Sequence, residues 1–263
     1  MIDLKYIGGY FPPHIASNAG MQKHILKEYV ELMVLDYLST TAYIHKLAFI
    51  GGTNLRLIKG IDRFSEDLDF DCNGLSRSEF MQMTDDVVSF LKNSGLRVET
   101  RDKTNDRLTA FRRNIYFPEL LFELGLTGHR EERFLLKIEA QDQGVDYAVE
   151  TRQVQGCGFF FTVPAPSDSV LLSMKLCALL SRAKGRDFYD SMFLMQQTRP
   201  SYEFLNARIG ISSPDKLKSA IAKKLKEINL NIKMKDFEHL LLNHGNANRI
   251  LHFEDACLKM TTI

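Results

Sequence analysis

The chain has 263 residues, of which 44% are hydrophobic and 25% charged, a composition typical of a globular protein and not of a disordered or fibrous one. Thirty-four Lys and Arg residues against 33 Asp and Glu residues leave a formal net charge of +1, which excludes a uniformly polybasic nucleic-acid binder. The four cysteines lie far apart, so we expect neither a disulfide framework nor a structural zinc site. We expect a cytoplasmic protein, because the chain shows no export signal and no apolar stretch of roughly 18 residues.

The first predicted elements lead to a glycine turn. Helical spacing predicts a helix from Met21 to His45, with Lys27 and Glu31 off its apolar face. The short apolar run Leu47–Ile50 predicts a buried strand, which Gly51-Gly52 ends. Thr53 is placed to cap a short helix through Ile58.

The next predicted strand, Asp67–Asp71, alternates strictly between polar and apolar residues. Its pattern puts Leu68 and Phe70 on one face of a sheet and three carboxylates on the other. A helix over Ser76–Leu96 follows. Further strands are expected over Leu96–Thr100, Arg107–Phe117, Arg133–Ala140 and Phe159–Val163. The prolines of Pro164-Ala-Pro166 mark a domain boundary, so the first predicted domain spans residues 1–165.

Beyond Ser167 every periodic segment is helical. Helices are predicted over Leu171–Leu180, Phe188–Met195, Phe204–Ile209, Leu217–Ile228, Phe237–Leu242 and Ile250–Met260. The short spacers between them favour a helical bundle over residues 166–263. The fold class is therefore predicted to be α+β, a mixed sheet with flanking helices followed by a C-terminal helical bundle.

The carboxylates of the Asp67–Asp71 strand indicate a metal site. Asp67 and Asp69 project to the same side, and like charges that close need a cation or a basic partner between them. Oxygen ligands favour Mg²⁺ or Mn²⁺ over zinc. A solvated strand edge is the plain alternative, and an EF-hand fails because Cys72 or Phe80 stands where glycine or glutamate is required. Together with the glycine turn, which can bring backbone N–H groups close to an anion, the pattern favours metal–phosphate chemistry.

Two sequence blocks resemble the nucleotidyltransferase AbiEii/AbiGii toxin family, within the DNA polymerase β-like nucleotidyltransferase superfamily. The first is Gly51-Gly52-Thr53 followed by Arg63-Phe-Ser-Glu-Asp-Leu-Asp69, and the second is Leu171–Asp190 with Lys175 and Arg186-Asp-Phe-Tyr-Asp190. The resemblance implies a nucleotidyltransferase-type sheet and transfer of a nucleoside monophosphate from an NTP to a hydroxyl group. It also implies Mg²⁺ or Mn²⁺ on Asp67 and Asp69, and nucleotide binding by Gly51, Gly52, Thr53 and Arg56.

The same resemblance implies three further catalytic residues. The superfamily supplies a third carboxylate from a later strand, and Glu139 is the candidate, because it shares a strand face with Lys137. An exposed glutamate paired with that lysine is the alternative. Lys175 lies within an apolar helix, where periodicity alone favours an ammonium directed to solvent. The family match implies instead that Lys175 contacts the triphosphate and that Asp187, also a plausible helix cap, organises that side of the site.

The acceptor is suggested by a basic segment. Residues 216–235 contain seven lysines and one acid, Glu227, for a local charge of 7 − 1 = +6. This is either the solvated face of a packed helix or a platform for RNA phosphates. The resemblance implies a toxin of bacterial toxin–antitoxin or abortive-infection systems, so RNA, with tRNA first, is the expected acceptor and a cognate antitoxin a possible partner. The alternatives are a small-molecule acceptor or a non-catalytic nucleotide-binding or protein-interaction module on the same fold.

Overall fold

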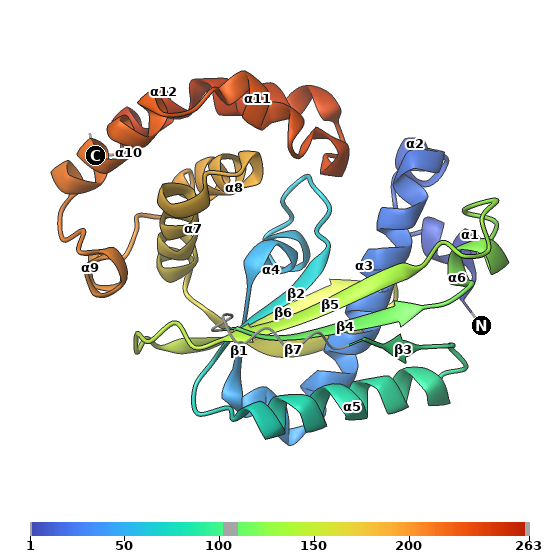
Figure 1. The fold of residues 1–263 in the computed structure, drawn as a ribbon. Helices are drawn as coiled ribbons and strands as arrows, with labels where there is room; N and C mark the ends of the chain where they lie inside the picture. The colour runs from blue at the N-terminus through green and yellow to red at the C-terminus, as the bar shows by residue number, and fades with distance from the viewer. Residues whose placement is uncertain (1, 102–109, 261–263) are drawn as a thin grey trace. The chain divides into compact units, whose positions relative to one another are not determined.

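The computed structural model describes residues 2–101 and 110–260, which form two compact units (Figure 1). The first unit comprises Met1–Gly60, Phe64–Asp142 and Thr151–Ala165. The second comprises Ile61–Arg63, Gln143–Glu150 and Pro166–Ile263. The sequence predicted two contiguous domains. The difference is that two short segments from the N-terminal part pack with the C-terminal helices, through side chains such as Asp62 and Arg63 that bond to them.

A five-stranded mixed sheet forms the centre of the first unit. In the order of the sheet, its strands are β1 (Leu47–Ile50), β2 (Asp67–Cys72), β5 (Phe134–Gln141), β4 (Phe111–Phe117) and β3 (Glu99–Thr100). β2 and β5 run parallel, and the other neighbours are antiparallel. The predicted α+β class with a mixed sheet is confirmed.

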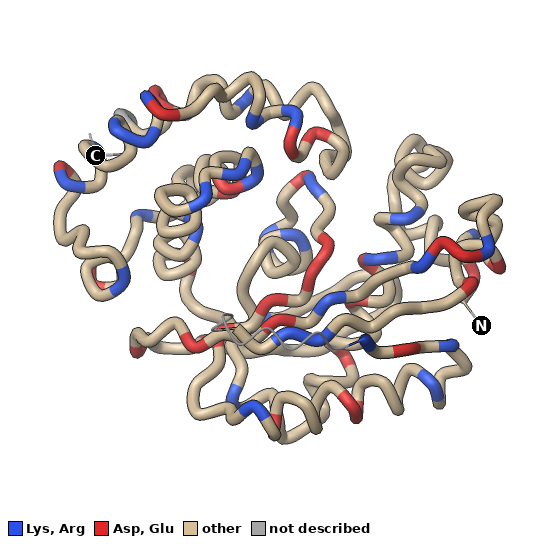
Figure 2. The backbone as a smooth tube through the Cα atoms, in the orientation of Figure 1, with Lys and Arg blue, Asp and Glu red and all other residues tan. Residues whose placement is uncertain are grey.

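The two faces of this sheet differ in chemistry because side chains alternate along each strand. Phe49, Leu68, Phe70, Ile138 and Ile115 lie on one face and are buried as core. The opposite face is polar. Its register places Asp69 beside Glu139 and Glu139 beside Arg112 on three consecutive strands. Figure 2 shows the resulting acidic and basic positions side by side on these strands.

Two long helices pack in the first unit. α3 (Ala19–Ser39) is buried on all sides and therefore lacks the single apolar stripe of a surface helix. α5 (Arg77–Asn93) begins at a capping box, in which Ser76 Oγ accepts from Glu79 N and Ser76 N donates to Glu79 Oε2. Shorter elements of this part of the chain are α1 (Leu4–Gly8), α2 (Pro13–Ala16), η1 (Ala42–Lys46), α4 (Gly51–Leu57) and α6 (Leu120–Glu123).

A separate two-stranded sheet, β6 (Val149–Gly156) and β7 (Phe159–Pro166), precedes the helices of the second unit. Those helices are α7 (Asp168–Arg182), α8 (Gly185–Met195), α9 (Tyr202–Ile209), α10 (Pro214–Lys226), α11 (Leu230–Lys235), η2 (Glu238–Leu240), η3 (His244–His252) and α12 (Phe253–Met260). α8 and α11 pack closely at Gly185, where an added Cβ would lie 2.7 Å from Phe237 Cδ1 and would overlap Lys233 O. Among the described residues, no helix is long and apolar enough to cross a membrane.

Several element boundaries differ from the sequence prediction. α3 ends at Ser39, where the hydroxyls of Thr40 and Thr41 bond the carbonyls of the last turn. α4 begins at Gly51, so Thr53 lies inside the helix and does not cap it. The predicted helix at Phe237–Leu242 is wrong, because only the 3₁₀ turn η2 forms there and Leu241 bridges to Arg63.

Other elements were shortened or missed. The predicted strand Leu96–Thr100 is reduced to β3, and the first three residues of the predicted strand Arg107–Phe117 lie outside the described residues. β6 was missed because its mostly polar, exposed sequence carries no apolar alternation. α11 was missed because none of its residues is buried. β7 continues through Pro164, which a two-stranded sheet with free edges tolerates.

Candidate functional site

The acidic centre of the first unit lies on the polar face of the sheet, where β2 meets β5. Asp67 and Asp69 share that face, and the parallel register brings Lys137 beside Asp67 and Glu139 beside Asp69. Lys137 Nζ is 3.0 Å from Asp67 Oδ1 and 3.7 Å from Glu139 Oε1. Arg112 Nε is 2.8 Å from the same Glu139 oxygen. The Lys137 ammonium therefore lies between Asp67 and Glu139, two of the carboxylates predicted to bind a metal. It supplies positive charge where the metal was predicted.

Of the three predicted metal ligands, Asp67 and Asp69 match what a divalent ion requires. Asp67 and Asp69 are oxygen donors on one strand face, and Mg²⁺ is commonly held by one or two carboxylates plus substrate phosphates. Glu139 is different, because it pairs with Arg112 in addition to Lys137, the cation that it shares with Asp67. Within the described residues there is also no cluster of three His, Cys, Asp or Glu side chains arranged to hold a metal. Asp67 and Asp69 thus fit the metal by donor type, with Lys137 having to leave Asp67. Glu139 fits only if both Arg112 and Lys137 leave it.

Gly51 is adapted to the Asp69 carboxylate. Its φ is +81°, a left-handed conformation that favours glycine. A Cβ added here would lie 2.7 Å from Asp69 Cβ and 2.8 Å from Asp69 Cγ. Only glycine therefore lets the chain turn from β1 into α4 directly against the acidic strand. No side chain caps α4, so its first backbone N–H groups are left to other acceptors.

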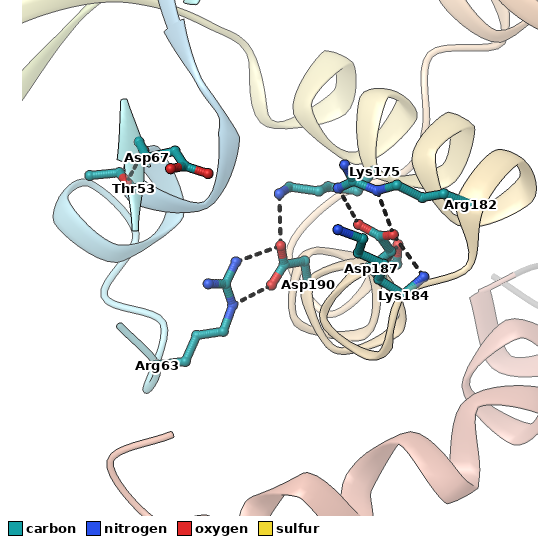
Figure 3. A network of polar contacts seen from close by, with 9 residues as sticks. Thr53, Arg63, Asp67, Lys175, Arg182, Lys184, Asp187 and Asp190 are labelled. Atoms are coloured by element: carbon teal, nitrogen blue, oxygen red, sulfur yellow. Dashed lines mark hydrogen bonds and ion pairs between the residues drawn. The ribbon is translucent and has the colours of Figure 1, made fainter. Parts of the chain in front are cut away.

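The side chains of α4 hold this turn in place. Thr53 is fully buried, and its Oγ1 donates to the carbonyl oxygen of Asp67 at 2.6 Å (Figure 3). Arg56 Nε donates to Glu28 Oε2 on α3 at 2.7 Å, and the guanidinium lies 5.1 Å from the centre of the Phe64 ring. These two predicted nucleotide-binding side chains are thus engaged in tying α4 to β2 and α3. Gly51 and Gly52, both partly exposed, are the backbone positions at the turn.

Two ionisable residues of α3 were missed by sequence reasoning. Glu31 is 1% exposed, and its Oε1 has no hydrogen-bond partner. Burial raises its pKa well above the ordinary value, an effect that the charge of Lys27 opposes. Burial also lowers the pKa of Lys27, whose Nζ bonds the Leu135 carbonyl and lies 4.9 Å from the centre of the Phe134 ring. Both were placed off the apolar face of this helix, but α3 has no exposed side on which to put them.

The second unit contains a buried cluster around Lys175. The Lys175 side chain lies on α7 and is nearly buried, and Nζ is 2.7 Å from Asp190 Oδ2 on α8. Arg63, fully buried, donates to both oxygens of Asp190 at 2.7 Å (Figure 3). Burial by itself would raise the pKa of Asp190, but the charges of Arg63 and Lys175 and their hydrogen bonds lower it to about 2. Lys175 is therefore held inside the unit instead of pointing to solvent.

Asp187 has the environment of the helix cap that the sequence suggested, without direct contact to Lys175. It is fully buried and accepts from Arg182 Nη2 at 2.8 Å and from the backbone N of Lys184 at 3.1 Å (Figure 3). These bonds fix the turn between α7 and α8 and cap α8. The direct contact with Lys175 belongs to Asp190, three residues later. The sequence signal for it was the second aspartate of Arg186-Asp-Phe-Tyr-Asp190, one helical turn after the first.

A second set of bonds holds the residue before Arg63. Tyr189 OH donates to Asp62 Oδ1 at 2.6 Å, and Asn246 Nδ2 donates to Asp62 Oδ2 at 2.5 Å. Burial, then the bond to Asp62, raises the pKa of the Tyr189 hydroxyl. Within the second unit, Asp62 and Arg63 are thus bonded to the helices α8 and η3.

Solved structures with this fold include two bacterial proteins. MenT4, a nucleotidyltransferase toxin from Mycobacterium tuberculosis, superposes with a TM-score of 0.64 and 16% identity, covering 100% of this chain and 91% of its own. JHP933 from Helicobacter pylori superposes with a TM-score of 0.54 and 19% identity, covering 90% of this chain and 91% of its own. At these identities the likeness shows the fold alone.

Comparison by sequence is more specific. No curated protein matches the chain. The model of a single family, described as the nucleotidyl transferase AbiEii toxin of Type IV toxin–antitoxin systems, matches residues 34–255. That range contains both the acidic strand with its glycine turn and the Lys175 cluster. The chain therefore belongs to the AbiEii nucleotidyltransferase toxin family.

Proposed function

We propose that this toxin nucleotidyltransferase depends on Mg²⁺ or Mn²⁺ and transfers a nucleoside monophosphate from an NTP to a hydroxyl of RNA, with tRNA the first candidate. The observation that carries the metal-dependent chemistry is the pair Asp67 and Asp69 on one face of β2, packed against the left-handed Gly51. Because a side chain at position 51 would displace Asp69, this turn and this carboxylate act as one structural feature.

In such a reaction, the residues of the first unit would have different roles. Asp67 and Asp69 would hold the metal, which when bound supplies positive charge for the phosphate oxygens. The uncapped N–H groups at the start of α4 favour an anion beside these carboxylates. Thr53 fixes the distance between α4 and β2 through its bond to Asp67 O. Lys137 occupies the cation position between Asp67 and Glu139, so binding a metal there would release its ammonium toward the substrate.

The second unit supplies a positive group. Two cations, Arg63 and Lys175, contact the single carboxylate of Asp190, so these three side chains carry a charge of 2 − 1 = +1. Arg63 is completely buried, and Lys175 is the more exposed of the two cations. This arrangement supports contact between Lys175 and the triphosphate. Asp187 would act indirectly, by fixing the α7–α8 turn.

The acceptor and partners are inferred from charge. Residues 216–235, which lie mostly on α10 and α11, contain seven lysines against Glu227, and Figure 2 shows Lys and Arg positions in blue along these helices. Lys216, Lys223, Lys226 and Lys235 are exposed. Such a surface favours the RNA phosphates of a tRNA over a neutral small molecule. The family's toxin–antitoxin assignment supports a cognate antitoxin as protein partner. We place the reaction in the bacterial cytoplasm, where NTPs and tRNA are abundant.

Transfer of label from an NTP to RNA tests the proposal. Each α-labelled NTP is incubated with total RNA and Mg²⁺, using the wild type, Asp69→Asn and the matched control Asp146→Asn at an exposed position. We expect label in the tRNA fraction with the wild type and the control, none with Asp69→Asn, and none when EDTA is added. Label in the small-molecule fraction would replace RNA as acceptor. No transfer with any NTP, or equal transfer by Asp69→Asn, would leave a non-catalytic binding module as the better explanation.

A further inference from the structure

The polar face of the sheet continues beyond the carboxylates onto β4 and β3. The register places Asn114 beside Lys137, and Tyr116 beside both Leu135 on β5 and Glu99 on β3. Since neighbouring strands lie about 4.8 Å apart, β4 is roughly 10 Å and β3 roughly 14 Å from the acidic strand β2. We call the residues Arg101, Arg112, Asn114 and Tyr116 the β4 face. It begins beside the reaction centre and leads away from it.

The chemistry of this face changes with distance from β2. Acidic side chains dominate at β2, whereas two guanidinium groups and an aromatic ring lie farther out. Arg101 lies 6.0 Å from the centre of the Tyr116 ring and 3.9 Å from Glu99. Its side chain is 58% exposed and that of Arg112 is 39% exposed. Asn114 and Tyr116 are partly exposed. Solvent therefore reaches an aromatic ring with one guanidinium group beside it, and Arg112 lies farther along the same face, next to Glu139.

These groups match one ligand class. An aromatic ring on a sheet stacks an unpaired base, guanidinium groups bind phosphates, and an amide reads base edges. Duplex RNA offers no exposed base face, so a ring would add nothing to its binding. An acceptor whose terminal hydroxyl must reach Asp67 and Asp69 would lie along the polar face, and the β4 face is its continuation by register.

We propose that the β4 face binds the single-stranded 3′ end of the acceptor RNA, with Tyr116 stacking on a base and Arg101 and Arg112 contacting phosphates. This inference rests on the proposed RNA acceptor and names where on the chain its end lies. It assigns a role to residues that neither the metal nor the triphosphate uses.

Binding of a labelled single-stranded RNA octamer with a free 3′ hydroxyl tests the inference without any turnover. The variants are Tyr116→Ala, Tyr116→Phe and Arg101→Ala. The matched controls are Tyr6→Ala and Arg97→Ala, whose side chains are also exposed. We expect Tyr116→Ala to bind about 5- to 10-fold more weakly and Tyr116→Phe to bind as the wild type, because stacking needs only the ring. Arg101→Ala should lower the salt slope by about 0.7, and the controls should change neither quantity.

The outcomes separate this inference from the proposed function. Unchanged binding by Tyr116→Ala, or RNA binding equally strong to a duplex, overturns the β4 face as a single-strand site. No binding of the octamer by the wild type also overturns it, even if label transfer to another acceptor is observed. Conversely, Tyr116-dependent binding in a protein that transfers no nucleotide supports the β4 face and contradicts the enzymatic proposal.

Discussion

Gly51 shows how a single missing side chain can leave room for a carboxylate, that of Asp69. We expect Gly51→Ala to lower nucleotidyl transfer about 100-fold, because the added Cβ would displace the Asp69 carboxylate on the order of 1 Å from its position. Gly60 is the matched control. Its φ of +71° is just as left-handed, yet nothing lies within 4 Å of an added Cβ. Gly60→Ala should cost about 1 kcal/mol of stability and leave the rate unchanged. If both variants lose the same fraction of the transfer rate per folded protein, backbone strain alone explains the effect of Gly51→Ala.

Glu31 provides a prediction about pH. Since burial raises its folded-state pKa above the ordinary 4.5, its contribution to stability is complete below about pH 4.5 and is lost as pH rises toward the folded pKa. Glu31→Gln removes this loss. We expect the free energy of unfolding of the variant to lie within about 1 kcal/mol of the wild-type value near pH 4. It should increase relative to the wild-type value as pH rises to 8. Urea unfolding followed by circular dichroism measures this.

The exposed Glu131 provides the control for that series, since Glu131→Gln should leave the dependence of the unfolding free energy on pH as it is in the wild type. If Glu31→Gln instead loses about 3 kcal/mol or more at pH 7, the carboxylate is ionised and acts as the counter-ion of Lys27.

What the sequence could predict at this scale depends on the range of the interaction. Asp67 and Asp69 share a face because strand periodicity is local, and the pattern of five residues was sufficient. The bond between Asp190 and Arg63 joins residues 127 positions apart, and no local pattern encodes it. The burial of Glu31 was also inaccessible, because the sequence of α3 does not show that neighbours cover every side of it.

At the scale of elements, Asp190 couples two helices of the second unit with the segment that contains Arg63. Asp190→Asn would leave Arg63 and Lys175 buried without their counter-ion, and we expect a loss of about 3–5 kcal/mol. Because the pKa of Asp190 is lowered to about 2, its stabilising effect is present above about pH 4 and is lost as pH falls toward 2. The difference from the wild type should therefore shrink over that window.

A matched control exists in the same unit. Lys233 and Asp236 form a partly exposed pair at 3.7 Å, so Asp236→Asn should cost less than about 1 kcal/mol. Urea unfolding monitored at 222 nm, which reports on the helices of both units, measures the two variants. Equal stability of Asp190→Asn and Asp236→Asn at pH 7 would contradict the view that the buried carboxylate holds α7, α8 and Arg63 together.

Elements were predictable where their burial is one-sided and their length sufficient. α5 shows both features, because it has 17 residues and buries one stripe that includes Phe80, Met83 and Val87. β6 and α11 lack the one-sided burial, since β6 is polar and mostly exposed and α11 buries no residue. Their positions depend on neighbours that are remote in the chain, which is why periodicity could not reveal them.

For the whole molecule, the near-neutral charge conceals a sorting of charge along the chain. Residues 216–235 carry +6, so the remainder carries 1 − 6 = −5. The acidic part includes the carboxylates of β2, and the basic part lies on α10 and α11. A uniformly basic protein would attract polyanions over its whole surface, whereas in this chain a strong local excess of positive charge lies in one segment of the second unit. Composition alone predicted the neutrality but not this separation.

The lysines of α10 and α11 differ in whether an acidic side chain pairs with them. This difference gives a matched test of RNA binding. Lys223 and Lys226 are exposed and have no acidic partner within the described part of the chain, whereas Lys224 pairs with Glu227 at 3.6 Å and Lys233 with Asp236. We expect Lys223→Ala combined with Lys226→Ala to reduce the salt slope of tRNA binding by about 0.7–0.9 for each lysine removed. The control, Lys224→Ala combined with Lys233→Ala, removes the same formal charge.

Filter binding of labelled tRNA between 50 and 200 mM salt, a range over which about six phosphate contacts change affinity ~1000-fold, measures both slopes. The control should keep most of the wild-type slope, because an ammonium already paired with a carboxylate releases fewer counterions on binding a phosphate. A common slope for the wild type and the Lys223/Lys226 variant would show that these lysines only solvate a packed helix. A loss in the control as large as in the test variant would mean that net charge, and not the position of unpaired lysines, determines RNA binding by this toxin.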